Sequence, residues 1–103
     1  MAKAEIFSGN CGYTTHVETS MDGSACSISI QSECNAIRKL AEDLKEVEPM
    51  NEISTRRRSP VILQKGALYC THAACPVPVG IIKAVEIAAG LALPTDVSIR
   101  LEK

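Results

Sequence analysis

The chain has 103 residues, of which 46% are apolar and 22% are charged, and its formal net charge is −1. These values are typical of one globular domain over residues 1–103 and exclude a disordered or fibrous chain. With no net positive charge and few aromatic residues, binding to nucleic acid is not expected. Residues 1–5 lack the apolar core of a signal peptide, and no apolar stretch approaches the ~18 residues that a membrane span requires. A cytoplasmic location without membrane attachment is therefore expected.

Three strands are predicted first. Residues 4–8 and 14–20 are rich in β-branched or aromatic types, and glycine-containing turn chemistry separates them. Residues 22–23, Asp-Gly, predict a tight hairpin turn. Apolar and polar side chains alternate over residues 26–31, as expected of a sheet that is covered on one face only. Cys26 opens this third strand on the apolar face and is expected in the core.

Three helices and a last strand are predicted next. Ser32 is suited to cap a helix over residues 33–47, which carries one apolar stripe at helical spacing. A serine and a first-turn proline predict a second helix over residues 60–69. A third helix over residues 78–90 is apolar around most of its circumference and ends at a glycine. Alternating apolar residues predict a last strand over residues 97–101.

The predicted order of elements is β-β-β-α-α-α-β. Strands that are grouped apart from helices indicate the α+β class. We therefore predict a mostly antiparallel four-stranded sheet with the helices packed on one face. The third helix should be the central and most buried one.

Four of the five cysteines lie beside predicted boundaries, and a reducing compartment would keep them as free thiols. The densest segment has two thiols and an imidazole within six residues. Thiolates and imidazole are preferred ligands of zinc, iron and iron–sulfur clusters. If the loop ends meet at one end of the sheet, the thiols could converge on such a centre. The predicted ligands are Cys11, Cys34, Cys70 and Cys75, with His72 as a substitute ligand or as a partner of a ligand.

Two other functions stay open at this point. Cys34 and Cys75 lie near predicted helix starts, where unpaired amides favour the thiolate, so either could be a nucleophile or a redox thiol. His72 would then be the natural proton acceptor. Alternatively, the cysteines are packed as small apolar residues in a non-catalytic interaction module. The partner could be a protein, a small molecule or a second copy of the chain.

Four segments carry a resemblance to a known family: GNCGYT at residues 9–14, SEC at 32–34, HAACPVP at 72–78 and GLALPTDV at 90–97. They resemble a family of small uncharacterised proteins, a domain of unknown function associated with anaerobic bacteria and archaea. The resemblance covers almost the whole chain and implies no activity. It implies an anaerobic setting, in which exposed iron–sulfur clusters survive more easily, and so favours the metal hypothesis.

Overall fold

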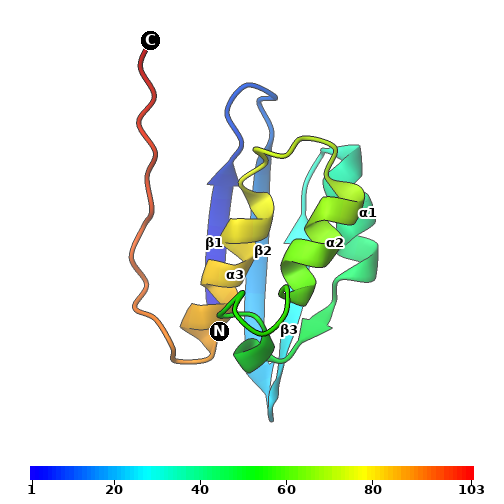
Figure 1. The fold of residues 1–103 in the computed structure, drawn as a ribbon, viewed down its shortest axis with the longest axis vertical. Coiled ribbons are helices and arrows are strands. Elements are labelled where there is room, and N and C mark those ends of the chain that lie inside the picture. The colour runs from blue at the N-terminus through cyan, green and yellow to red at the C-terminus, as the bar shows by residue number, and fades with distance from the viewer.

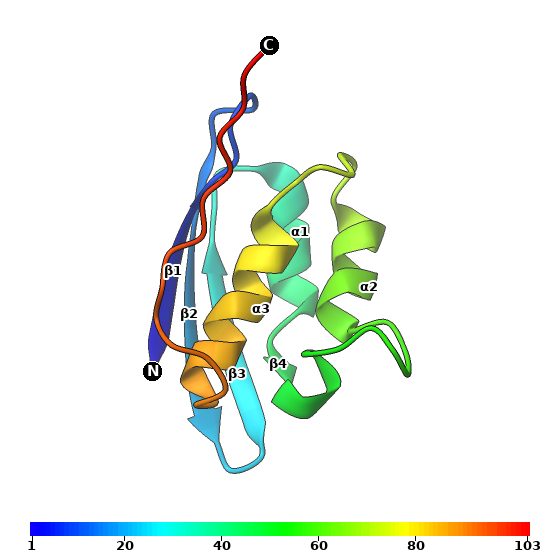
Figure 2. The same cartoon turned by 60° about the vertical axis from the view of Figure 1, so that its left-hand side comes forward.

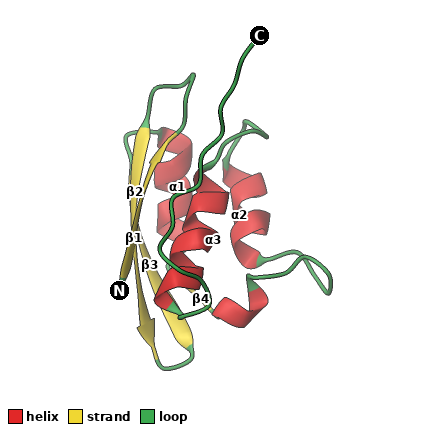
Figure 3. Cartoon of the chain, turned by 90° about the vertical axis from the view of Figure 1, so that its left-hand side faces the viewer, coloured by secondary structure: helices red, strands yellow, loops and turns green.

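The chain folds into one layer of strands that is covered on one face by three helices (Figures 1 and 3). The computed structural model describes residues 1–103. In chain order the elements are β1 (Ala2–Phe7), β2 (Thr14–Asp22), β3 (Ala25–Gln31), α1 (Asn35–Asp43), β4 (Glu46–Val47), the 3-10 helix η1 (Pro49–Asn51), α2 (Val61–Tyr69) and α3 (Val77–Ala88). The predicted fold class, α+β with a four-stranded antiparallel sheet and helices on one face, is confirmed.

The sheet has the strand order β1-β2-β3-β4, and each neighbouring pair is antiparallel. The predicted hairpin joins β2 to β3, with Asp22 opposite Ala25. In β2 the side chains of Thr15, Val17 and Thr19 are buried, whereas the residues between them are exposed. The sheet therefore has one face on the core and one face in solvent, as the alternation in the sequence predicts.

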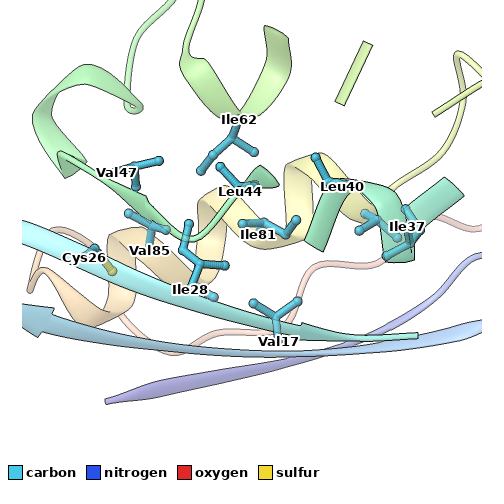
Figure 4. Close-up of a cluster of buried hydrophobic side chains, with 12 residues drawn as sticks. Val17, Cys26, Ile28, Ile37, Leu40, Leu44, Val47, Ile62, Ile81 and Val85 are labelled. Carbon is cyan, nitrogen blue, oxygen red and sulfur yellow. The ribbon is translucent and has the colours of Figure 1, made fainter. Parts of the chain in front are cut away.

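Twelve buried apolar side chains fill the space between the sheet and the helices (Figure 4). They are Val17, Cys26, Ile28, Ile37, Leu40, Leu44, Val47, Ile62, Val77, Ile81, Ala84 and Val85. α3 packs against β1, β2 and β3, and four of its side chains have no exposed surface. This confirms that the third helix is the central one. The core position that we expect for Cys26 is confirmed as well.

α1 is shorter than the sequence predicts, because the chain becomes extended at Leu44. The apolar pattern predicts a helix over residues 33–47, but Leu44 already has φ −103° and ψ 91°. β4 then pairs with β3, with Val47 opposite Cys26. Leu44 and Val47 are both buried, so an extended segment satisfies the same apolar pattern and gains ladder hydrogen bonds at the sheet edge.

The segment after α3 is extended and does not join the sheet. Gly90, with φ 74°, ends α3 in the left-handed conformation, as predicted. Residues 97–101 are extended, but no strand forms there, and the fourth strand of the sheet is β4 instead. We call residues 93–103 the arm. It runs alongside β1 in the same direction as that strand and reaches beyond the body of the fold (Figures 1 and 2).

A glutamate nine residues upstream caps α2. The serine cap that the sequence predicts is not used, because Pro60 is the N-cap residue and has no side-chain cap. Instead the Glu52 carboxylate, 2% exposed, accepts hydrogen bonds from the amides of Val61 (3.1 Å) and Ile62 (2.8 Å). A carboxylate at this position accepts hydrogen bonds from amides that have no partner in the helix, and its negative charge interacts favourably with the positive end of the helix dipole. The loop between them carries Arg56–Arg58, which are exposed.

Candidate thiol site

Three cysteine-bearing segments meet at one end of the molecule. The β1–β2 loop, the start of α1 and the connection between α2 and α3 all lie at the same end (Figures 1 and 2). Cys11 is in the first of these segments, Cys34 in the second, and Cys70 and Cys75 are in the third. The condition that the predicted convergence of thiols requires is therefore met by the topology.

Cys34 is held at the start of α1 by a local hydrogen-bonded turn. It is the N-cap residue, and its amide donates to the hydroxyl of Ser32 (3.2 Å). The same hydroxyl accepts a hydrogen bond from Thr15 on β2 (3.0 Å). Ser32 therefore orients the backbone ahead of the helix. The prediction that Ser32 caps the helix is wrong, because Cys34 is the N-cap residue. The side chain of Cys34 is half-buried and packs against the core.

Cys70 and Cys75 lie on either side of a short exposed turn. Cys70 ends α2, and its amide donates to the carbonyl of Gly66 (2.8 Å). The amide of Cys75 donates to the carbonyl of His72 (3.1 Å), which closes the turn ahead of α3. Both thiols are half-buried against the core, whereas residues 71–74 are exposed. The turn therefore brings the end of one helix and the start of the next together, with a thiol on each.

α2 and α3 approach each other closely at Gly66 and Pro78. A Cβ atom added to Gly66 would lie 2.7 Å from Cγ of Pro78, which is closer than van der Waals contact permits. Gly66 is one helical turn before Cys70, and Pro78 is in the first turn of α3. Glycine is thus required at this position by the approach of the two helices.

Cys75 and Cys34 influence the ionisation of Cys70. The pKa of Cys70 is raised from 9.0 to about 11, first by burial and then by the charge of Cys75 and hydrogen bonding to it, with a smaller contribution from the charge of Cys34. A negative charge raises the pKa of a thiol most strongly when it is close. A partly buried environment strengthens this effect, because it screens the charge less than water does. We call the three half-buried cysteines at this end of the molecule, Cys34, Cys70 and Cys75, the thiol cluster.

The remaining predicted ligands do not join this cluster. Cys11 is exposed on the β1–β2 loop, and His72 is exposed in the turn before α3. No group of three or more histidine, cysteine, aspartate or glutamate side chains is arranged to hold a metal ion. Of the five predicted ligands, three cysteines are thus half-buried, and Cys11 and His72 are exposed.

The other notable side chains lie away from the cluster. Burial raises the pKa of the Cys26 thiol, which contacts the carbonyl of Ser27 at 3.8 Å inside the core. His16 is on the solvent face of the sheet, 3.8 Å from the Glu5 carboxylate. A hollow of about 410 Å³ at this end of the molecule is lined by the solvent face of β2 and β3 and the residues beside them, among them Glu33, and by no cysteine.

Sequence reasoning missed a polar network that ties α1 to α2. Lys65 donates to the carbonyl (2.9 Å) and the carboxylate (3.2 Å) of Asp43, and the Tyr69 hydroxyl donates to the same carboxylate (2.8 Å). The hydrogen bond from Tyr69, followed by that from Lys65, lowers the pKa of Asp43. Lys65 and Tyr69 are four residues apart on one face of a helix, and that spacing is the signal in the sequence.

Comparison with known proteins gives a family but no activity. A family model described as "Family of unknown function (DUF6951)" matches residues 2–101. The chain belongs to this family. Neither a curated protein nor a solved structure matches it. The predicted membership of a domain of unknown function is thus confirmed, and the association with anaerobes stays a prediction. None of the helices combines the length and apolar character that crossing a membrane requires.

Proposed function

We propose that this protein carries out thiol–disulfide exchange through Cys70 and Cys75. The observation that carries the proposal is the placement of two half-buried thiols on either side of one exposed turn, with Cys75 close enough to raise the pKa of Cys70. Two thiols in this arrangement are the reactants of a dithiol–disulfide couple. Cys34, the third member of the thiol cluster, adds negative charge beside Cys70 when it is ionised.

The roles of the two cysteines follow from their protonation. Because the pKa of Cys70 is about 11, this thiol keeps its proton at neutral pH. The attacking thiolate is therefore assigned to Cys75, since the thiolate is the nucleophile in exchange reactions. Cys75 attacks one sulfur of a substrate disulfide, the substrate S–S bond breaks, and the other half of the substrate leaves as a thiolate.

The second step closes the internal disulfide. Cys70 loses its proton and attacks the Cys75 sulfur of the mixed disulfide, which releases the second half of the substrate as a thiolate. The substrate gains two electrons and the two thiol protons, and the protein gains the Cys70–Cys75 bond. In the mixed disulfide Cys75 carries no charge, so one cause of the raised pKa of Cys70 is removed. Formation of the intermediate thereby favours its own resolution.

The surroundings favour a substrate disulfide that is presented at a surface. The turn between the two cysteines is exposed, and the 410 Å³ hollow at this end of the molecule includes no cysteine in its lining. A site of this kind can be reached by a disulfide on a protein surface or by a small flexible disulfide. A deep substrate pocket is not needed for either.

The experiment uses glutathione as the redox partner. Protein purified without oxygen is equilibrated with mixtures of reduced and oxidised glutathione, acid-quenched, alkylated and digested for mass spectrometry. We expect a Cys70–Cys75 disulfide to form in the oxidising mixtures. In Cys70→Ser the resolving thiol is absent, so glutathione should accumulate on Cys75. Cys11→Ser is the matched control, because Cys11 is exposed but outside the cluster.

Several results would contradict exchange at this pair. They include two free thiols at Cys70 and Cys75 in every mixture, or glutathione that collects on Cys11 as readily as on Cys75. The interaction-module hypothesis, in which the cysteines only pack, would then be favoured. In that case alanine at both positions should leave partner binding intact.

A soft metal ion is a second candidate function, favoured by the third thiol. A dithiol couple needs two sulfurs, whereas zinc or an iron–sulfur cluster needs three or four ligands, and Cys34 supplies a third. Occupation would require the thiol cluster to rearrange, because no group of three side chains is arranged as a metal site. Metal analysis of oxygen-free protein tests this candidate: zinc or iron at one equivalent, lost in Cys34→Ser, would support it. Absence of both metals would remove it.

A further inference from the structure

β1 is a long strand with one open edge. It stands at the end of the sheet and pairs with β2 alone, so alternate amide and carbonyl groups on its other side have no strand partner. The opposite edge of the sheet is β4, which is only two residues long. Natural proteins usually cover, shorten or pair a long edge strand, because it can add a strand from another chain.

The arm beside this edge has the sequence pattern of a strand and no partner. Val97, Ile99 and Leu101 are 62%, 78% and 86% exposed, and they alternate with polar residues along an extended backbone. Three apolar side chains exposed at alternating positions are unfavourable in water and suited to a sheet with one covered face. The arm is therefore a strand whose apolar side is unburied within its own chain.

A groove lies where an added strand would place its apolar side chains. It measures about 430 Å³ and is formed by β1, α3 and the start of the arm. Ala4 and Ile6 line it from the strand, and Gly80 and Ile87 line it from the helix. The helix-facing side of the open edge is thus accessible and carries apolar side chains, with Lys83 of α3 beside them.

Strand direction and charge distinguish between the chain's own arm and that of another copy. α3 delivers the arm at the end where β1 begins, so the chain's own arm can approach only parallel to β1 (Figure 1). If parallel pairing places Arg100 opposite Glu5, then Glu102 falls opposite Phe7. In the antiparallel direction the same starting pair places Glu102 opposite Lys3. Antiparallel pairing thus places two pairs of opposite charges across from each other on the solvent face. Only the arm of a second copy can approach in this direction.

The apolar residues agree with this antiparallel register. With Arg100 opposite Glu5, alternation places Ile99 opposite Ile6 and Leu101 opposite Ala4, all on the side that faces α3. These are the positions that line the groove. A single register therefore pairs the open backbone groups of β1, buries the apolar side chains of the arm and forms both pairs of opposite charges.

We propose that the arm of one copy adds antiparallel to the β1 edge of a second copy, so that two copies exchange arms as a symmetric dimer. Each copy gives one strand and receives one, as expected of a two-fold interface. This interface is independent of the thiol cluster, and its test does not depend on the proposed exchange chemistry.

Sedimentation equilibrium of the full chain tests the proposal through a charge-reversal cycle. Opposite charges placed directly across a sheet are stabilising and like charges are destabilising, and the dimer contains each pair twice. Arg100→Glu and Glu5→Arg should therefore each raise the dimer Kd on the order of 10-fold at low salt. The double variant should restore most of the loss. Arg56→Glu, in an exposed loop, is the matched control and should leave the Kd unchanged.

The apolar side of the arm gives a second, independent test. Ile99→Lys should weaken association strongly because it places a positive charge beside Lys83 and removes an apolar side chain, whereas Ser98→Lys, on the solvent face, should have a much smaller effect. Circular dichroism checks that these variants fold, which is expected because the arm lies outside the core. A chain that is monomeric at every concentration would overturn the proposal. So would a dimer whose Kd is unmoved by Arg100→Glu, or arm amides whose exchange protection does not depend on concentration.

Discussion

Removal of the Glu52 carboxylate is expected to destabilise the fold substantially. This side chain is 2% exposed, and its two oxygens accept the amides of Val61 and Ile62. A hydrogen bond to a charged group contributes about 1.5–3 kcal/mol, and a buried donor that loses its acceptor retains the full desolvation cost. Ile62 has no exposed surface, whereas Val61 is partly exposed and can be hydrated. We therefore expect Glu52→Ala to lower the free energy of unfolding by about 3 kcal/mol.

The assay is urea unfolding followed by far-ultraviolet circular dichroism. Glu52→Gln should lose about half as much, because its amide oxygen can still accept from Ile62 while its NH2 group faces the Val61 amide, donor to donor. Glu48→Ala is the matched control, since this glutamate is four residues away and exposed, and it should change stability by less than about 0.5 kcal/mol. If Glu52→Ala were as stable as that control, the side chain would not be the cap of α2.

Three further predictions concern the contacts that hold the helices. Gly66→Ala should cost about 1–3 kcal/mol by urea unfolding despite alanine's better helix propensity, because its methyl group collides with Pro78. Thr19→Val should cost about 1 kcal/mol in the same assay, since the buried hydroxyl donates to a backbone carbonyl of α3 (2.8 Å). Tyr69→Phe should raise the pKa of Asp43, measured by NMR titration, toward its ordinary value of 3.8. Because that pKa is lowered in the fold, the stability it contributes is present at neutral pH and is lost as the pH falls through the lowered value.

Most of the architecture follows from patterns that are local in the sequence. Alternation over β2 and β3, the Asp-Gly hairpin and the glycine stop at Gly90 all predict what the structure contains. The end of α1 was not predictable in this way, because Leu44 and Val47 fit a helical stripe and a buried extended segment equally well. Pairing with β3, which is distant in the sequence, decides between the two. The Glu52 cap was not predictable for a similar reason, since the amides that it accepts from are nine and ten residues further along the chain.

The sequence predicts where in the fold the candidate site lies, but it does not predict which of the five residues are exposed. The position of Cys34, Cys70 and Cys75 at the ends of helices indicates that they can meet, and the topology brings these ends together. Cys11 and His72 are equally close to boundaries but lie in exposed turns, and no local pattern distinguishes an exposed turn from a half-buried one. α2 and α3 approach each other closely at Gly66, which only the tertiary structure reveals.

The interaction between the thiols of Cys70 and Cys75 is tested most directly by the pH dependence of alkylation. Peptide-resolved iodoacetamide labelling of Cys70 is followed from pH 7 to 12 in the wild-type chain and in Cys75→Ala. The wild-type profile should rise near a pKa of about 11. In Cys75→Ala it should move to lower pH while staying above 9.0, because the charge and hydrogen bonding of Cys75 are gone but burial remains. An identical profile in the two proteins, or a wild-type profile with a pKa of 9.0, would contradict an interaction between the two thiols.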